Sequence, residues 1–165
     1  MKAGINIALT VVALAASILL AKAHAADAVV GTWRLVSWIE EETETKIQHK
    51  TFGDNPAGLI TYTADGRMMV IFIDPNRKPP AGPKPTDSEA AQLYRTMAAY
   101  AGAYVVEGDK VTHKIEVSSN QVWNGTDQQR FFEVKENHLT IRTPPFVSPF
   151  LGKQIVATLV WERVK

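Results

Sequence analysis

The chain has 165 residues, of which 45% are apolar and 21% are charged, a composition typical of one folded domain and not of a disordered chain. It contains no cysteine, which excludes disulfides, thiolate metal sites and cysteine nucleophiles. The formal net charge of +1 provides no electrostatic footprint for nucleic acid or for an anionic membrane surface.

The N-terminus has the features of a secretory signal. Lys2 supplies a positive start, residues 5–20 form an apolar run without charge, and Ala23 and Ala25 are small residues at the positions that signal peptidase recognises. We therefore predict a cleavable signal peptide over residues 1–25 and an exported domain, periplasmic or secreted, over residues 26–165. An uncleaved membrane anchor is the alternative, although the run is shorter than the roughly 20 residues of a spanning helix.

The rest of the chain is predicted to consist mainly of strands, because apolar and polar residues alternate between turn signals such as Asp65-Gly66 and Gly108-Asp109. In the first strand, Trp33, Leu35 and Ser37 are expected to share one face. The predicted strands are residues 31–42, 46–51, 59–63, 67–73, 100–106, 110–119, 128–135, 138–143 and 154–163.

A proline-rich segment and one helix interrupt this series after residue 73. Residues 74–85 contain five of the nine prolines, which excludes a central strand or a helix there. Thr86 and Glu89 have the spacing of a capping box, and apolar residues at helical spacing follow as far as about Ala99. The predicted fold is all-β: a single up-and-down antiparallel barrel of eight to nine strands with one inserted helix, since closure removes exposed strand edges.

The two ends of the chain resemble those of lipocalins, with Gly31-Thr32-Trp33 in the first strand and Trp161-Glu162-Arg163 in the last. More specifically, the chain resembles the bacterial and fungal lipocalin-like domain family, calycin-type barrels. The resemblance implies that Arg163 lies over Trp33, and that a small barrel holds a pocket for an apolar ligand. The matching stretches are GTWRLVSW, FGDNPAGLITYTADGRMMV, AYAGAYVVEGDKVTHKIEVS, WNGTDQQRFFEV, LTIRTPP and LVWER.

His113 is the main candidate for chemistry, because it shares a strand face with Val111, Ile115 and Val117. It is expected either to contact a ligand or to be a core histidine bonded to a neighbouring hydroxyl. Many relatives have two histidines in this stretch, whereas Lys114 follows His113 here, which disfavours a paired-histidine site.

Arg130 is expected to share the barrel interior with His113. It could hold a carboxylate or carbonyl of a ligand, or bond to Glu116 or Asp127 at the rim. The candidate ligand-binding residues are Tyr62, Tyr104, His113 and Arg130. Phe146, Phe150 and Trp123 are expected to line the barrel mouth or to cap the core, and Met68, Met69 and Met97 to belong to a pocket wall or to the core.

Two hypotheses for function follow. The first is an exported protein that binds a small apolar or amphipathic ligand, with no nucleic-acid partner and no membrane contact after signal cleavage. The second is a lipocalin-fold enzyme of isomerase or cyclase type that uses His113 as general base. Neither hypothesis includes a cofactor or a metal, because the histidines lie in separate elements without nearby carboxylate spacing. The sequence predicts no oligomeric state.

Overall fold

The computed structural model describes residues 27–165, so the predicted signal peptide and its cleavage site lie outside the described residues. Strands make up most of this part of the chain, as predicted. The elements are β1 (Gly31–Glu42), β2 (Gln48–His49), β3 (Ala57–Tyr62), β4 (Arg67–Ile73), α2 (Asp87–Arg95), β5 (Met97–Glu107), β6 (Lys110–Ser118), the 3-10 helix η1 (Gln121–Trp123), β7 (Asp127–Lys135), β8 (His138–Arg142), β9 (Phe146–Val147) and β10 (Gln154–Arg163).

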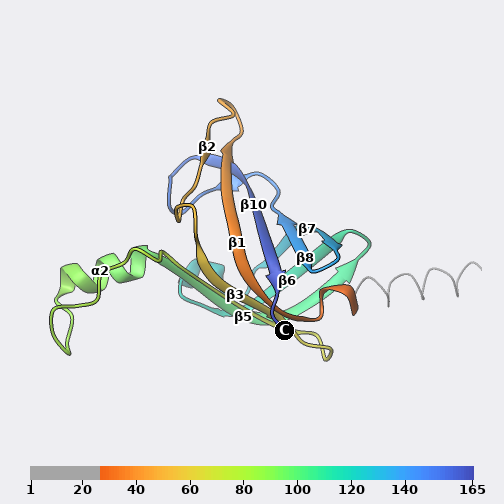
Figure 1. The fold of residues 1–165 in the computed structure, drawn as a ribbon, viewed down its shortest axis with the longest axis horizontal. Coiled ribbons are helices and arrows are strands. Elements are labelled where there is room, and N and C mark those ends of the chain that lie inside the picture. Colours follow the sequence, from red (N-terminus) through yellow and green to blue (C-terminus); the bar gives the residue numbers. More distant parts are fainter. Residues whose placement is uncertain (1–26) are drawn as a thin grey trace, which may run out of the picture.

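The strands form a closed antiparallel barrel, which confirms the predicted architecture (Figure 1). Eight strands follow one another around the barrel in the order β1-β3-β4-β5-β6-β7-β8-β10, and β10 pairs with β1 to close it. The closing pairs run from Trp33 opposite Arg163 to Glu42 opposite Ile155. The two short strands β2 and β9 extend the sheet beside β1 and β10.

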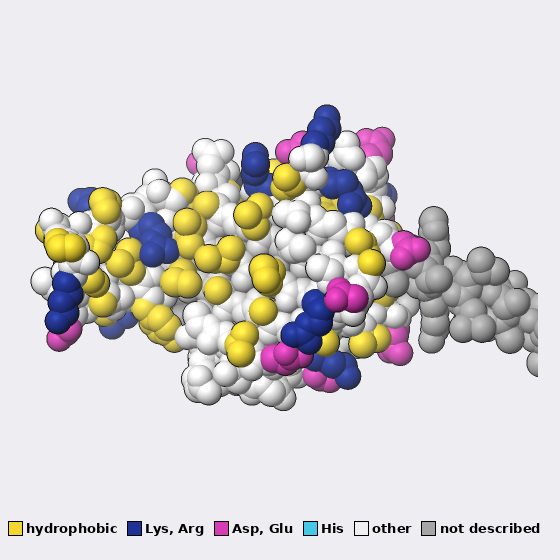
Figure 2. All heavy atoms as spheres, turned by 90° about the horizontal axis from the view of Figure 1, so that it is seen from below, with side chains coloured by type: hydrophobic (Ala, Val, Ile, Leu, Met, Phe, Trp, Pro, Cys, Tyr) yellow, Lys and Arg dark blue, Asp and Glu magenta, His cyan; other side chains and the backbone are white. Residues whose placement is uncertain are grey.

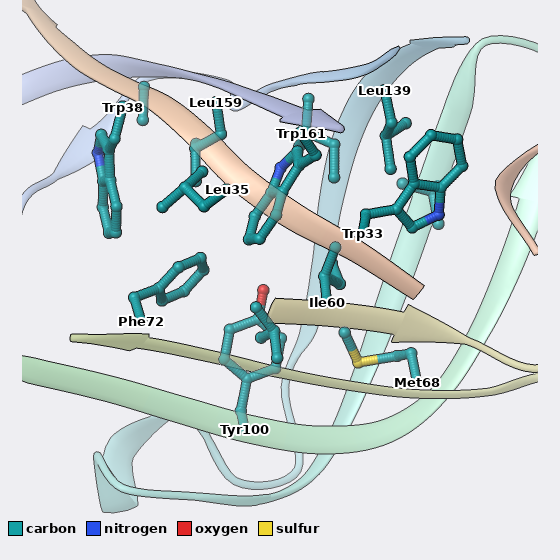
Figure 3. Packing of buried hydrophobic residues seen from close by; sticks show 14 of the residues in the cluster. Trp33, Leu35, Trp38, Ile60, Met68, Phe72, Tyr100, Leu139, Leu159 and Trp161 are labelled. Carbon is teal, nitrogen blue, oxygen red and sulfur yellow. The ribbon is translucent and has the colours of Figure 1, made fainter. Parts of the chain in front are cut away.

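The core lies inside the barrel, because alternate residues of each strand point inward. In β10, for example, Ile155, Ala157, Leu159 and Trp161 are buried and the residues between them are not. Figure 3 shows how large side chains from opposite walls meet in this interior, with Trp38, Leu35 and Trp161 facing Phe72 and Tyr100.

Two β-bulges change which residues point inward, and they correct two predictions. In β1, the register shifts between Leu35 and Ser37, so that Trp38 is buried and Ser37 is not. Between β5 and β6, a shift at Ala101/Gly102 leaves Val117 61% exposed on the outside. A bulge inserts one extra residue into a strand, so every residue beyond it changes face. Strict alternation from His113 was therefore wrong for Val117.

Helix α2 begins as the sequence predicted and ends earlier. The Thr86 hydroxyl accepts from the Glu89 amide, and the Glu89 carboxylate accepts from the Thr86 amide at 2.8 Å, which completes the capping box. The helix ends at Arg95, not near Ala99, because Ala98 and Ala99 pair with β4. No residue of α2 is buried, and the helix projects from the barrel (Figure 1). In residues 27–165, no helix is long and apolar enough to cross a membrane.

The outer face of β3 to β6 is apolar and exposed. Met69 on β4 and Val117 on β6 are 62% and 61% exposed, and Leu59 and Ile71 beside them are both 44% exposed. Figure 2 views the molecule from below and shows apolar side chains spread over its underside. Both faces of β4 are therefore apolar, and within residues 27–165 no other element covers its outer face.

Candidate functional site

His113 lies in the barrel wall on β6, between Tyr104 on β5 and Gln128 on β7. Its side chain is buried, with 1% relative exposure. Both ring nitrogens are hydrogen bonded to tyrosines: Nε2 lies 2.7 Å from the Tyr62 hydroxyl and Nδ1 lies 3.1 Å from the Tyr100 hydroxyl. His113 therefore has the contacts of a core histidine that is bonded to neighbouring hydroxyls. Its ring also borders a cavity.

Burial controls the ionisation of these three side chains. Burial and, to a smaller extent, the nearby Arg130 guanidinium together lower the pKa of His113 from 6.5 to about 3, so the imidazole is neutral at physiological pH. Burial also raises the pKa of Tyr62 well above its ordinary value. For Tyr100, burial raises the pKa and the adjacent positive charge of Arg130 partly offsets that rise. All three groups are therefore uncharged at neutral pH.

A cavity of about 440 Å³ occupies the barrel interior beside His113, within the usual size range of small-molecule sites. Inward-facing residues of the barrel form its floor and sides, and two loops complete it. Figure 3 shows the Tyr100 ring rising from β5 with its hydroxyl directed into the interior. The lining residues are Trp38, Ile60, Phe72, Ala98, Tyr100, His113, Asn120, Val122, Trp123, Gln128, Gln129, Arg130, Ile141, Thr143, Pro144, Pro145, Phe146, Val147, Pro149, Phe150, Ala157, Leu159 and Trp161.

Arg130 supplies the positive charge of this cavity. Its Nη2 donates to the Gln128 side chain at 2.5 Å, and its Nη1 donates to the Gln129 carbonyl at 2.9 Å. The predicted structural partners take other roles: Glu116 forms a two-bond ion pair with Arg67 at 2.6 and 2.7 Å, and Asp127 is exposed. A rim ion pair between Arg130 and Glu116 or Asp127 was therefore a wrong expectation.

The structure separates the four predicted ligand-binding residues into two groups. His113 and Arg130 line the cavity, whereas Tyr62 and Tyr104 do not. Tyr62, on β3, is hydrogen bonded to His113 and holds its ring in place without reaching the cavity itself. The Tyr104 hydroxyl donates to the Thr63 carbonyl at 2.9 Å, and its ring packs edge-on against Tyr62 with centroids 4.9 Å apart. Both are therefore supporting residues.

Tyr100 is a polar cavity residue that was not among the predicted site residues. It lies on the same face of β5 as Tyr104, four residues before it, with Gly102 between them on that face. Because Tyr104 was predicted to face the interior, the alternation along this strand could have predicted the same for Tyr100. The expected loop aromatics Trp123, Phe146 and Phe150 do line the cavity, whereas Met68, Met69 and Met97 do not.

A buried carboxylate holds the loop that forms one wall of the cavity. Glu40 points inward from β1 and accepts from the Ser148 and Thr51 hydroxyls, each at 2.9 Å. The Ser148 hydroxyl in turn accepts from the Phe150 amide at 3.2 Å. Phe150 packs edge-on against Trp38, with centroids 5.7 Å apart. These contacts fix the loop over the barrel interior without any covalent cross-link.

No metal site is assembled in the part of the chain that the structure describes. Within residues 27–165, no group of three or more His, Asp or Glu side chains is placed to hold a metal ion. His113, the histidine nearest the cavity, has both nitrogens bonded to tyrosines.

Comparison with known proteins identifies a family. A family model described as a lipocalin-like domain matches residues 30–164. No curated protein matches the chain significantly. Among solved structures, the chain is similar to an uncharacterized protein from Bacteroides eggerthii DSM 20697, with 10% sequence identity, a TM-score of 0.39, and coverage of 82% of this chain and 99% of that chain. The matched residues include every strand from β1 to β10.

Proposed function

Because the chain belongs to the lipocalin-like domain family, we propose that it is an exported protein that binds a small apolar or amphipathic molecule inside its barrel. The observation that carries the proposal is the interior cavity of about 440 Å³, which has aromatic, aliphatic and proline walls and a few polar groups at one side. Such a combination of apolar surface with few oriented polar groups is typical of ligand sites. Export rests on the sequence of residues 1–25.

The contacts of His113 favour binding over catalysis. A general base needs a free lone pair within reach of the substrate. Both nitrogens of His113 are already hydrogen bonded to tyrosines, and burial keeps the pKa of the ring at about 3, far below neutral pH. The enzyme hypothesis with His113 as general base therefore has less support than the binding hypothesis.

The direct test is a binding measurement with an uncharged fluorescent probe, N-phenylnaphthylamine. We expect its fluorescence to rise on addition of residues 26–165, because the cavity is apolar. The variant Ala98→Leu fills space at the cavity wall, so it should weaken probe binding. Ala103→Leu is the matched control, because Ala103 lies on the same strand and does not line the cavity.

Loss of binding in both variants, or in neither, would contradict a site in the barrel. Native mass spectrometry of the protein purified from its own host supplies an independent measurement. A co-purified small molecule at one-to-one stoichiometry is the expected result. For export, sequencing of the exported protein should give an N-terminus at Ala26, and recovery of only full-length chain in membranes would contradict it.

A further inference from the structure

The polar side of the cavity indicates the chemistry of its ligand. We infer that the ligand is an amphipathic carboxylate, whose acidic head binds Arg130 and Tyr100 while its apolar body lies among the aromatic side chains. This inference rests on the proposed function, because it assigns the chemical class of the molecule that occupies the same cavity.

Arg130 is a cation without an anionic partner in the described chain. It is the sole charged residue among those that line the cavity in residues 27–165, and no ion pair there involves it. Residues 1–26 contain no Asp or Glu. A guanidinium has five N–H donors, and the two bonds to Gln128 and Gln129 leave donors available. An anion is the partner that a half-buried guanidinium in apolar surroundings requires.

The hydrogen bonds around His113 make the Tyr100 hydroxyl a second hydrogen-bond donor for a ligand, beside Arg130. A neutral imidazole donates through one nitrogen and accepts through the other. Tyr62 is buried, with 1% exposure, and His113 is the only hydrogen-bond partner of its hydroxyl in the described chain. If Tyr62 accepted from His113, its own hydroxyl proton would be buried without an acceptor, which is unfavourable. The favoured arrangement therefore has Tyr62 donating to Nε2.

The direction of the remaining bonds follows from that assignment. With Nε2 as the acceptor, the proton of His113 lies on Nδ1, which donates to the Tyr100 oxygen at 3.1 Å. The Tyr100 proton is then free to point away from His113, into the cavity that Tyr100 lines. Tyr62, His113 and Tyr100 thus form a directed chain of hydrogen bonds that ends in a donor beside the Arg130 guanidinium.

Two adjacent donors, one of them charged, match the two oxygens of a carboxylate. A cationic head is disfavoured, because the cavity is lined by no Asp or Glu of the described chain and contains Arg130. The opposite walls accept an apolar, planar body: Trp38, Phe72 and Trp161 all line the cavity. Edge-to-face contacts with such rings favour an aromatic or unsaturated body.

Three molecules that share one apolar body test the inference. Naphthylacetic acid, naphthylethanol and naphthylethylamine would each compete with N-phenylnaphthylamine for residues 26–165 at neutral pH. We expect the acid to bind roughly tenfold or more tightly than the alcohol, the size of one charge-assisted hydrogen-bond pair, and the amine to bind more weakly than the alcohol. Added salt should reduce the preference for the acid.

Two variants assign the preference to residues. Arg130→Gln removes the charge and keeps a hydrogen-bonding side chain, so the acid should then bind no more than about threefold more tightly than the alcohol. Tyr100→Phe should reduce the preference by roughly three- to tenfold. Arg142→Gln is the matched control: Arg142 is exposed on the neighbouring strand β8, so this variant should keep the preference of the unmodified protein.

Each result separates this inference from the proposed function. If N-phenylnaphthylamine binds but acid and alcohol compete equally in the unmodified protein, the carboxylate inference is wrong and the proposed function stands. A preference for the amine has the same consequence. If neither the probe nor any of the three competitors binds, the proposed function itself fails. An acid preference that survives Arg130→Gln overturns the role of Arg130.

Discussion

The guanidinium of Arg163 lies 3.9 Å from the ring centroid of Trp33, so the last strand of the barrel covers the first tryptophan of the chain. The same guanidinium donates to the carbonyls of Val30 at 2.7 Å and Ala28 at 3.0 Å. The Trp33 indole donates to the Val29 carbonyl at 2.8 Å. The two ends of the domain are therefore tied together by the cation–π contact that the resemblance implied and by the two hydrogen bonds of Arg163.

We predict that Arg163→Ala lowers the free energy of unfolding by about 1–2 kcal/mol. The cation–π contact contributes about 1 kcal/mol, and loss of the charged donor leaves two carbonyls unbonded. Urea unfolding followed by tryptophan fluorescence measures the change. Arg142→Ala, at an exposed arginine of β8, should change stability little. Equal effects of the two substitutions would show that the tie between the chain ends does not stabilise the fold.

Gly102 lies where the bulge brings β5 and β6 close together. A side-chain carbon there would collide with the Lys114 carbonyl oxygen and would lie 3.0 Å from the Glu116 amide nitrogen. We predict that Gly102→Ala destabilises the protein by about 2 kcal/mol or more, because backbone on both strands has to move. In the control Gly82→Ala, the new carbon has nothing within 4 Å, and thermal unfolding should be almost unchanged. An equally stable Gly102→Ala variant would contradict the close approach of the two strands.

The buried, neutral His113 should make stability depend on pH below neutrality. Its pKa is lowered to about 3 in the folded protein, from 6.5, first by burial and then by Arg130. Between these values the unfolded chain binds a proton that the folded protein does not, so stability rises with pH and falls as the solution is acidified from about pH 6.5. The expected loss between pH 7 and pH 5 is about 2 kcal/mol.

Denaturant unfolding at a series of pH values checks this dependence. His113→Gln replaces the imidazole by a side chain that does not titrate, so the stability of this variant should vary less between pH 7 and pH 5. His138→Gln is the control, because His138 is exposed on β8. An unchanged pH dependence in His113→Gln would mean that the ring is not held neutral by burial.

The contribution of Glu42 to stability should be lost at a lower pH than the contribution of His113. Its carboxylate accepts from Lys153 at 2.5 Å, from Thr45 at 2.6 Å and from His49 at 2.7 Å, and these bonds, with Lys153 the largest contributor, lower its pKa from 4.5 to about 2. The stabilisation is therefore complete above about pH 4.5 and is lost as the pH falls toward 2.

Comparison of Glu42→Gln with the unmodified protein measures this contribution. The stability difference between the two should shrink as the pH falls from 4.5 to 2. A constant difference over that range would show that the carboxylate charge has no part in the effect.

For ligand binding, we predict that His113→Ala weakens the affinity for naphthylacetic acid and that Lys114→Ala does not. His113 lines the cavity and holds Tyr100, whereas Lys114 is exposed on the opposite face of β6. The affinity should fall roughly three- to tenfold, the effect of losing one hydrogen bond that orients the Tyr100 hydroxyl. Fluorescence competition measures it. Equal affinities in the two variants would remove His113 from the site.

The sequence alone determined the barrel and the strands that build it. Alternation and turn residues placed β1, β4 and β10 at their observed bounds, because a period of two along a strand and glycine in tight turns are local properties. The capping box of Thr86 and Glu89 is local in the same sense. The burial of His113 also followed from its apolar neighbours on the strand.

Only the tertiary structure decided which residues meet. The bulges that turn Val117 outward and Trp38 inward arise from how two strands pair, and neither strand alone encodes the shift. The choice of Tyr100 over Tyr104 as a cavity residue depends on hydrogen bonds to residues 13 and 41 positions away in the chain. The partner of Arg130 was mispredicted for the same reason, because Arg67 reaches Glu116 across 49 positions. Contacts between distant segments depend on barrel closure, which a local pattern does not contain.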